Sequence, residues 1–379
     1  MRPEARLLLA LSRTPLLPVA EVRALAVEVK DWERALALSE RHAVAQLVHR
    51  QLEAASPPGL PSRIREQFRA WWDENALRSF TLTGHLLDLV EALEARGVKP
   101  IPMKGPVLAM GVYGDIALRR FVDLDILVPR AGLPAARALL AELGFATATP
   151  MKAGAERALE RSDYHVAYAN RATGITVELH WALTRDVPGT HVSEHWAWWN
   201  AREVELLGRR VRALSWEALL VYLCVHGSKH GWERLAWIVD VAELLRVAPS
   251  MDWSAVATLA GECGARRMLP LGLSLARDLL GASIGAEAWR HARETASVRG
   301  LAREVRERLF DDDGAGAPGL GFQLRVRERA RHRGAYLLHL LTAPHVADVE
   351  AIPLPRGSRW LYRVLRPGRL LLKRLRRAR

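Results

Sequence analysis

The segment "MKGPVLAMGVYGDIALRRFVDLDILVPR", residues 103–130, indicates the fold of this chain. Within it, "RFVDLDILVP" has the apolar and β-branched residues of a strand and carries Asp123 and Asp125 two positions apart. Side chains at i and i+2 point to the same side of a strand, so we expect both carboxylates on one face. The opposite face would be packed by Val122, Leu124 and Ile126.

Two carboxylates on one buried strand face repel each other, and one of them would normally hold a proton. A divalent cation removes this repulsion, and proteins bind Mg²⁺ through carboxylates together with substrate phosphates. We therefore predict a Mg²⁺ site at Asp123 and Asp125. The spacing alone leaves a second interpretation open, in which the acids belong to an exposed face or to a network of salt bridges. In such a network, the aspartates would pair with Arg119, Arg120 and Arg130.

A third carboxylate is found in "ITVELHWAL", residues 175–183, which we predict to be the second strand of a hairpin turning at 170–174. Alternation places Glu178 and His180 on one face of this strand. If it lies beside the first strand, Glu178 approaches the aspartates, and the three acids suit a two-metal phosphoryl-transfer site. His180 could equally be a buried residue with satisfied hydrogen bonds.

Basic residues flank the acidic strand. Lys104 and Gly105 end a short extended segment just before a helix expected to begin at Pro106. Glycine allows a phosphate to approach the backbone closely, and Lys104 adds a positive charge. Arg119 and Arg120 directly precede the strand and could clamp phosphate oxygens. We predict that these four residues bind phosphate oxygens.

The pattern along the rest of the chain predicts an α+β protein with a small mixed sheet flanked by helices. Apolar residues at helical spacing indicate a helical N-terminal region over 1–95. Residues 96–215 mix strands and helices and would form the core, and helical patterns return over 216–345. A basic tail follows at 346–379, and the glycine- and aspartate-rich stretch 310–321 is expected to be a loop.

The net charge of +13 is concentrated at one end of the chain. Residues 356–379 hold ten Arg or Lys and no acid, so the rest of the chain carries about +3. The tail would be a solvated helix or would bind an anionic surface or nucleic acid. With two cysteines, no apolar stretch of membrane-spanning length and a short, interrupted apolar patch at the N-terminus, we expect a cytoplasmic protein.

Four stretches together resemble the uncharacterised bacterial nucleotidyltransferases of the polymerase-β-like superfamily: "MKGPVLAMGVYGD", "LRRFVDLDILV", "VELHW" and "HGSKHGWERLAWIVDVAELL". The resemblance implies an ATP- or other NTP-binding enzyme that transfers a nucleoside monophosphate with the help of Mg²⁺. Asp123, Asp125 and Glu178 would then be catalytic metal ligands, with Glu178 helping to deprotonate the acceptor hydroxyl. The superfamily's usual Gly-Ser is replaced here by Lys104-Gly105, and the spacing from Gly105 to Asp123 is longer than its general pattern.

Two other functions stay open at this point. The chain could be a catalytically inactive binding or scaffold protein that keeps the fold, or a toxin-type nucleotidyltransferase acting on tRNA or protein. The acceptor has no short sequence signature. The stretch "HGSKH" also places His226 and His230 at i and i+4, with Asp240 ten positions later, a spacing that would suit zinc. The same histidines could instead line a helix junction or face the nucleotide.

Overall fold

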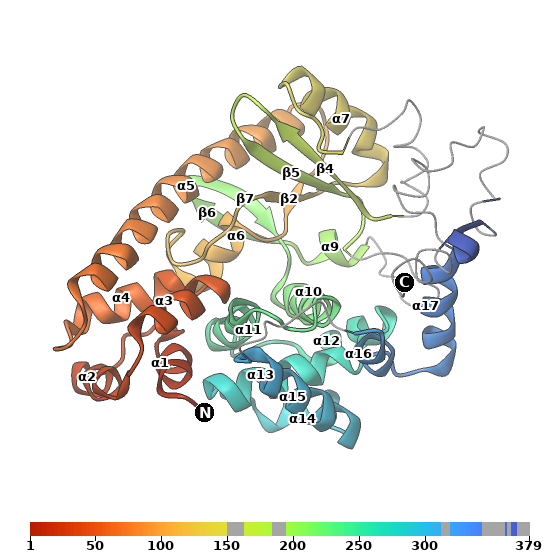
Figure 1. Cartoon of the computed structure of the whole chain (residues 1–379). Coiled ribbons are helices and arrows are strands. Elements are labelled where there is room, and N and C mark those ends of the chain that lie inside the picture. The colour runs from red at the N-terminus through yellow and green to blue at the C-terminus, as the bar shows by residue number, and fades with distance from the viewer. Residues whose placement is uncertain (150–162, 184–194, 312–318, 343–360, 362–364, 370–379) are drawn as a thin grey trace.

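Helical regions flank a small mixed sheet in the computed structural model (Figure 1). The structure describes residues 1–149, 163–183, 195–311, 319–342, 361 and 365–369. The α+β class expected from the sequence is confirmed. No helix in these described ranges combines the length and apolar character needed to cross a bilayer. Most of the basic tail, all but 361 and 365–369, and the centre of the 310–321 stretch lie outside the described residues.

Five helices precede the sheet: α1 (Pro3–Leu11), α2 (Val19–Glu28), α3 (Trp32–Arg41), α4 (Ala45–Ala55) and α5 (Ser62–Glu94). Asp31 caps α3 by accepting a hydrogen bond from the Arg34 amide. The long α5 ends where Gly97 adopts a φ of +73°, a left-handed conformation that glycine reaches without strain. This end delivers the chain to the first strand of the sheet.

The sheet has the order β1-β2-β5-β4-β3, with β2 parallel to β5 and the other neighbours antiparallel. The hairpin of β4 and β5 turns at Asn170, whose side-chain oxygen accepts hydrogen bonds from the amides of Ala172 and Thr173. The expected hairpin is therefore present. The strands are β1 (Ile101–Pro102), β2 (Leu124–Leu127), β3 (Ala146–Thr147), β4 (His165–Asn170) and β5 (Ile175–His180).

Short helical elements connect the first strands. The helix expected at Pro106 begins there as α6 (Pro106–Leu108) and widens into a π-helical turn, η1 (Ala109–Tyr113). After β2, the 3₁₀ turn η2 (Arg130–Gly132) leads into α7 (Leu133–Glu142). A second hairpin, β6 (Arg202–Leu206) with β7 (Arg209–Ala213), was not anticipated from the sequence and follows the short α9 (His195–Trp199).

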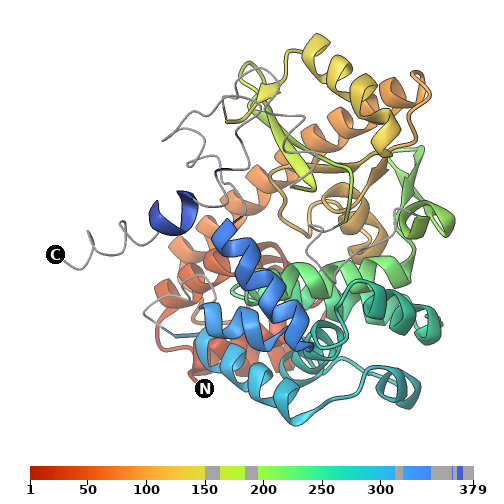
Figure 2. The same ribbon diagram turned by 90° about the vertical axis from the view of Figure 1, so that its right-hand side faces the viewer.

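The C-terminal region is helical. It comprises α10 (Trp216–Lys229), α11 (Leu235–Val247), α12 (Trp253–Glu262), α13 (Met268–Leu280), α14 (Ala286–His291), α15 (Ala296–Leu309), α16 (Leu320–Arg325) and α17 (Ala330–Thr342). Helix α10 starts at a Ser215 cap that accepts from the Ala218 amide. In Figure 1 it lies directly below the sheet, and the turned view of Figure 2 again shows it next to the sheet layer.

Two apolar clusters make up the core. One joins N-terminal helices to C-terminal ones, running from Leu7 to Val326, and the other packs the sheet against α5 and α7. Helix α5 belongs to both, because Ile64 and Phe68 pack in the first cluster whereas its second half, from Leu82, packs in the second. The two helical regions thus share one core. The division of the chain at 95, 215 and 345 stays a prediction.

Candidate active site

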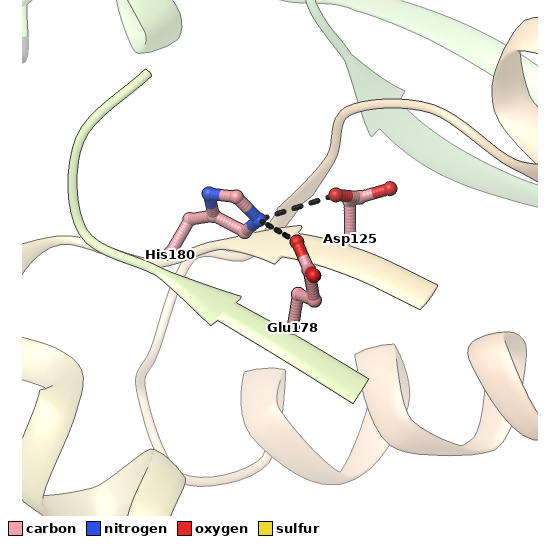
Figure 3. A group of neighbouring side chains, drawn as sticks. All are labelled: Asp125, Glu178 and His180. Atoms are coloured by element: carbon pink, nitrogen blue, oxygen red, sulfur yellow. Dashed lines mark hydrogen bonds and ion pairs between the residues drawn. The ribbon is translucent and has the colours of Figure 1, made fainter. Parts of the chain in front are cut away.

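Asp125 and Glu178 are direct neighbours on parallel strands. Strand register pairs Asp125 of β2 with Glu178 of β5, which is the arrangement expected if the two strands lay side by side. Their side chains project from the same face of the sheet (Figure 3). The Asp125 carboxylate is almost fully buried, with 2 % of its side chain exposed, whereas Glu178 keeps 28 % exposed. One acid is therefore enclosed and the other is open to solvent or substrate.

His180 bridges the two acids. Its Nε2 lies 3.2 Å from Asp125 Oδ1 and 3.2 Å from Glu178 Oε2, so that one ring nitrogen serves both carboxylates (Figure 3). Burial alone would lower the pKa of His180, but the hydrogen bonds to Asp125 and Glu178 outweigh it and the pKa is raised. Sequence reasoning placed this histidine on the face of Glu178 but gave it no role. The signal was the strand alternation itself.

Lys104 neutralises Asp125 from the opposite side. Strand β1 runs beside β2, and the Met103 amide donates to the Asp125 carbonyl, which brings the Lys104 Nζ to 3.2 Å from Asp125 Oδ1. Burial would raise the pKa of Asp125, but Lys104 and the hydrogen bond from His180 hold it well below its usual range. Asp125 is therefore a charged carboxylate in the interior.

Gly105 shapes the backbone next to Lys104. Its φ of +59° and ψ of −126° belong to a region that residues with a β-carbon rarely occupy. The conformation turns the chain from β1 into α6 and keeps the Gly105 backbone against that of Asp123, because a β-carbon there would lie 3.6 Å from the Asp123 carbonyl oxygen. Glycine is thus required for the turn, whatever it binds.

Asp123 lies at the bend just before β2 and is partly exposed. Burial and the nearby Asp125 carboxylate raise its pKa to about 6, which reflects the repulsion expected between the two acids. The expectation that Val122 packs with Leu124 and Ile126 is wrong, because Val122 is 54 % exposed. The strand begins only at Leu124, so its alternation does not extend back to Val122 or Asp123, and the expectation that both aspartates belong to the strand holds only for Asp125.

Arg119 and Arg120 point in different directions. Arg119 forms a two-pronged ion pair with the fully buried Asp240 of α11, with Nε–Oδ1 2.8 Å and Nη2–Oδ2 3.0 Å, and the Tyr113 hydroxyl donates to the same carboxylate. Arg120 is exposed and lines a small pocket with residues of α3 to α5. Their binding of phosphate stays a prediction.

Asp240 is not placed to bind zinc together with His226 and His230. Helix α10 continues through Gly227 to Lys229, so His226 and His230 do lie one turn apart, with ring centroids 4.7 Å from each other. Asp240, however, is committed to Arg119 and Tyr113. Within the described ranges, the group of side chains spaced to share one ion is Asp125, Glu178 and His180, whose ligand atoms lie within 4.8 Å of one another.

The donor set at this site fits a divalent cation. Two carboxylates from adjacent strands and the His180 ring have ligand atoms within 4.8 Å of one another. Oxygen ligands of this kind suit Mg²⁺, and the imidazole of His180 would also suit Mn²⁺ or Zn²⁺. Asp125, Glu178 and His180 are therefore close enough together to share one ion, and Lys104 places a positive charge beside Asp125. That Asp123 completes the metal site stays a prediction.

Comparison with known proteins places these residues in a family. No curated protein matched the chain. Two structures of the antibiotic-resistance factor ANT(2'')-Ia are similar at 15 % identity and a TM-score of 0.34. The solution structure covers 48 % of this chain and 90 % of that one, and the crystal structure in complex with adenylyl-2''-tobramycin covers 47 % and 94 %. This similarity is too low to support an inference.

The family model described as "Uncharacterised nucleotidyltransferase" matches residues 28–281. This range spans two thirds of the chain, from the end of α2 to the end of α13, and contains the acids, Lys104 and the histidines of α10. The resemblance stated from the sequence motifs is thereby confirmed. The chain belongs to the family of uncharacterised nucleotidyltransferases.

Proposed function

We propose that the chain transfers a nucleoside monophosphate from an NTP to an acceptor hydroxyl, with release of pyrophosphate, and that the reaction depends on Mg²⁺. The observation that carries this proposal is the pairing of Asp125 with Glu178 on adjacent parallel strands, with Asp123 at the entry to the first. Membership of a nucleotidyltransferase family supports the same chemistry. The nature of the acceptor is left open.

The acids have two tasks in this proposal. Asp123, Asp125 and Glu178 hold the metal, which supplies charge neutralisation at the phosphates of the NTP. Glu178, the more exposed of the two paired acids, also takes the proton of the acceptor hydroxyl. The acceptor oxygen then forms a bond to the α-phosphorus while the bond between the α-phosphorus and the bridging oxygen breaks, and pyrophosphate leaves.

Positive charge and backbone shape would position the triphosphate. The Lys104 Nζ lies 3.2 Å from Asp125 Oδ1, and its flexible four-carbon side chain would let the ammonium leave Asp125 for a phosphate oxygen. Gly105 adopts a positive φ that turns the chain into α6, and this turn would bring the backbone at the start of α6 to the phosphates. Arg119 and Arg120 would contribute from the segment before β2. Catalysis would then come mainly from positioning and charge neutralisation.

The test needs no acceptor. Nonhydrolysable analogues of all four NTPs are titrated calorimetrically into wild type and into Asp123→Asn/Asp125→Asn, with and without Mg²⁺. We expect Mg²⁺-dependent binding to wild type that falls at least tenfold in the double variant. Asp115→Asn is the matched control, because Asp115 is an exposed acid of the same segment. Absence of NTP binding by folded wild type, or full binding by the double variant, would overturn the proposal.

Turnover is tested separately. If the NTP binds as expected, pyrophosphate release is measured with hydroxyl-bearing acceptors of several classes, namely sugars, small metabolites, peptides, RNA and proteins. Release that requires both an acceptor and Glu178 supports a transferase. Binding without release from any acceptor class would instead favour the non-enzymatic function, in which the fold serves as a nucleotide-binding module.

A further inference from the structure

A cluster of three rings lies on the helices next to the acids. His226 on α10, His230 at its end and Trp237 on α11 contact one another, with centroids 4.7 Å apart for the two histidines and 5.3 and 5.2 Å from each to Trp237. All three residues are partly exposed, and Trp237 also packs against the main apolar cluster. We refer to these three residues as the ring cluster.

Contacts along α10 place the ring cluster close to the acids. Tyr222, one turn before His226, has its ring 5.8 Å from the Lys104 Nζ and 6.1 Å from the His226 ring. Further along the helix, the Lys229 Nζ donates to the Tyr164 hydroxyl at 2.5 Å. Helix α10 therefore faces the side of the sheet that bears Asp125, and His226 lies between its two contacts.

The sheet side of this region is also built of rings. The His165 ring stacks on that of His180, with centroids 4.9 Å apart and planes 16° from parallel, and Tyr164 packs against both. The His180 ring in turn bonds the two acids. Planar side chains are thus found near the acids on both the sheet and α10, and the ammonium groups of Lys104 and Lys229 contact Asp125 and Tyr164 of the sheet side.

The ring cluster is uncharged near neutral pH. Burial, together with the positive charges of Lys229 and Lys104, lowers the pKa of His230 to about 4, and burial also lowers that of His226 well below its usual value. A neutral imidazole offers one hydrogen-bond donor and one acceptor beside a flat face. Two neutral imidazoles and an indole form a surface suited to stacking and edge contacts with a planar heterocycle.

We propose that the ring cluster binds the base of the NTP. This inference rests on the proposed function, since it places the triphosphate at Lys104 and Asp125. A base is joined to its phosphates by a single ribose, so a nucleotide held there extends along α10 past Tyr222 to His226. The donor and acceptor of each imidazole would then contact the edge of the base, and Trp237 would provide the broadest stacking face.

The experiment compares two ligands that share phosphates but differ in the base. Calorimetric titrations with Mg²⁺ use a nonhydrolysable NTP analogue and inorganic tripolyphosphate, on wild type, Trp237→Leu and His230→Ala. We expect NTP affinity to fall about tenfold or more in each variant, as for loss of one stacked base, with tripolyphosphate affinity unchanged. Trp72→Leu and His49→Ala are matched controls, because their rings form a similar pair 5.5 Å apart on α5 and α4.

The outcomes separate the two proposals. Unchanged NTP affinity in both variants, with tripolyphosphate bound by wild type, overturns the ring cluster as the base site and leaves the proposed function standing. Equal losses of affinity for the NTP analogue and for tripolyphosphate also overturn this base site, since the base would then contribute nothing to the affinity that the variants remove. If wild type binds neither ligand, the proposed function itself fails.

A conservative variant guards against misfolding. Trp237→Phe keeps a ring and should retain most of the NTP affinity. It also removes one indole, so the fluorescence change caused by the NTP analogue in wild type should be smaller in this variant. Tripolyphosphate should cause no such difference between the two proteins. An identical NTP-induced change in wild type and Trp237→Phe would show that the base does not contact this residue.

Discussion

Lys104 and Asp125 form a buried ion pair in which the ammonium lies 3.2 Å from the carboxylate that would hold a metal. A buried carboxylate needs a nearby positive charge, because an unpaired charge in the interior is strongly unfavourable. Lys104 meets this need when no metal is present, together with the hydrogen bond from His180. A metal ion at Asp125 would therefore compete with Lys104. The ammonium that the metal displaces could then pair with the phosphate oxygens of the nucleotide.

Replacing Lys104 by Met should raise the affinity for Mn²⁺ in the absence of nucleotide by about tenfold, because the competing cation is gone. The same change should weaken binding of the NTP analogue, because its phosphates lose a positive partner. Mn²⁺ binding is followed by electron paramagnetic resonance and nucleotide binding by calorimetry. The exposed Lys99, replaced by Met, is the control for a change of net charge. Unchanged or weaker Mn²⁺ affinity in Lys104→Met would contradict competition.

The ion pair of Arg119 with Asp240 joins the segment before β2 to α11. The two residues are 121 positions apart, and the Asp240 carboxylate is also bonded by Tyr113. Asp240→Asn should destabilise the fold by about 3–5 kcal/mol, since it leaves the buried Arg119 guanidinium without its carboxylate. The double variant Arg119→Met/Asp240→Leu should lose clearly less than the sum of its single changes. Urea unfolding of wild type, Arg119→Met, Asp240→Leu and the double variant provides the cycle, with Asp240→Asn measured beside them, and strict additivity would contradict the coupling.

Local patterns were enough to predict the chain's secondary structure near the site. The apolar run around Asp125, the hairpin turn at Asn170 and the alternation through Glu178 all depend on neighbours in sequence, and all appear in the structure. The parallel pairing of the two acidic strands was expected only conditionally, because nothing in either strand specifies its partner. The pairing of β2 with β5 is determined by how all the strands of the sheet pack together.

Partners distant in sequence could not be predicted. Arg119 has the same local context as Arg120, yet one pairs with Asp240 and the other faces solvent. Lys104 was expected to bind phosphate because it precedes a helix, whereas its nearest charged group here is Asp125. Glycine is unfavourable within a helix, and "HGSKH" contains Gly227. The helix nevertheless continues past Gly227, because the buried Trp232 ring packs on that glycine.

Gly227→Ala should destabilise the protein despite the better helix propensity of alanine. A β-carbon at this position would lie 2.5–2.6 Å from carbons of the Trp232 ring, so helix or ring must move. Overpacking of this kind typically costs about 1–3 kcal/mol. Gly300 on α15 is the matched control, since a β-carbon there meets nothing within 4 Å and Gly300→Ala should add about 0.5–1 kcal/mol. Equal effects of the two substitutions in urea unfolding would contradict this packing role.

His42 should make the stability of the fold depend on pH. Its ring is fully buried at the end of α3, accepts a hydrogen bond from the Leu235 amide at Nδ1, and packs edge-on against Phe310. Burial and the positive charges of Arg41 and Arg234 lower its pKa to about 4. The unfolded chain, with a histidine pKa of about 6.5, therefore binds a proton first as the pH falls.

The stabilising contribution of a neutral His42 is fully present above pH 6.5 and is lost progressively as the pH falls from 6.5 to about 4. Between pH 7.5 and pH 5, this one residue should lower the free energy of unfolding by roughly 2 kcal/mol. His42→Gln should be less stable than wild type at pH 7.5, because the buried ring is lost. Between pH 7.5 and pH 5, however, its free energy of unfolding should fall by roughly 2 kcal/mol less than that of wild type. Urea unfolding of both proteins at pH 7.5, 6 and 5 measures the difference. If the two pH profiles run parallel, the titration of His42 does not contribute, and the acid sensitivity of the fold must come from other groups.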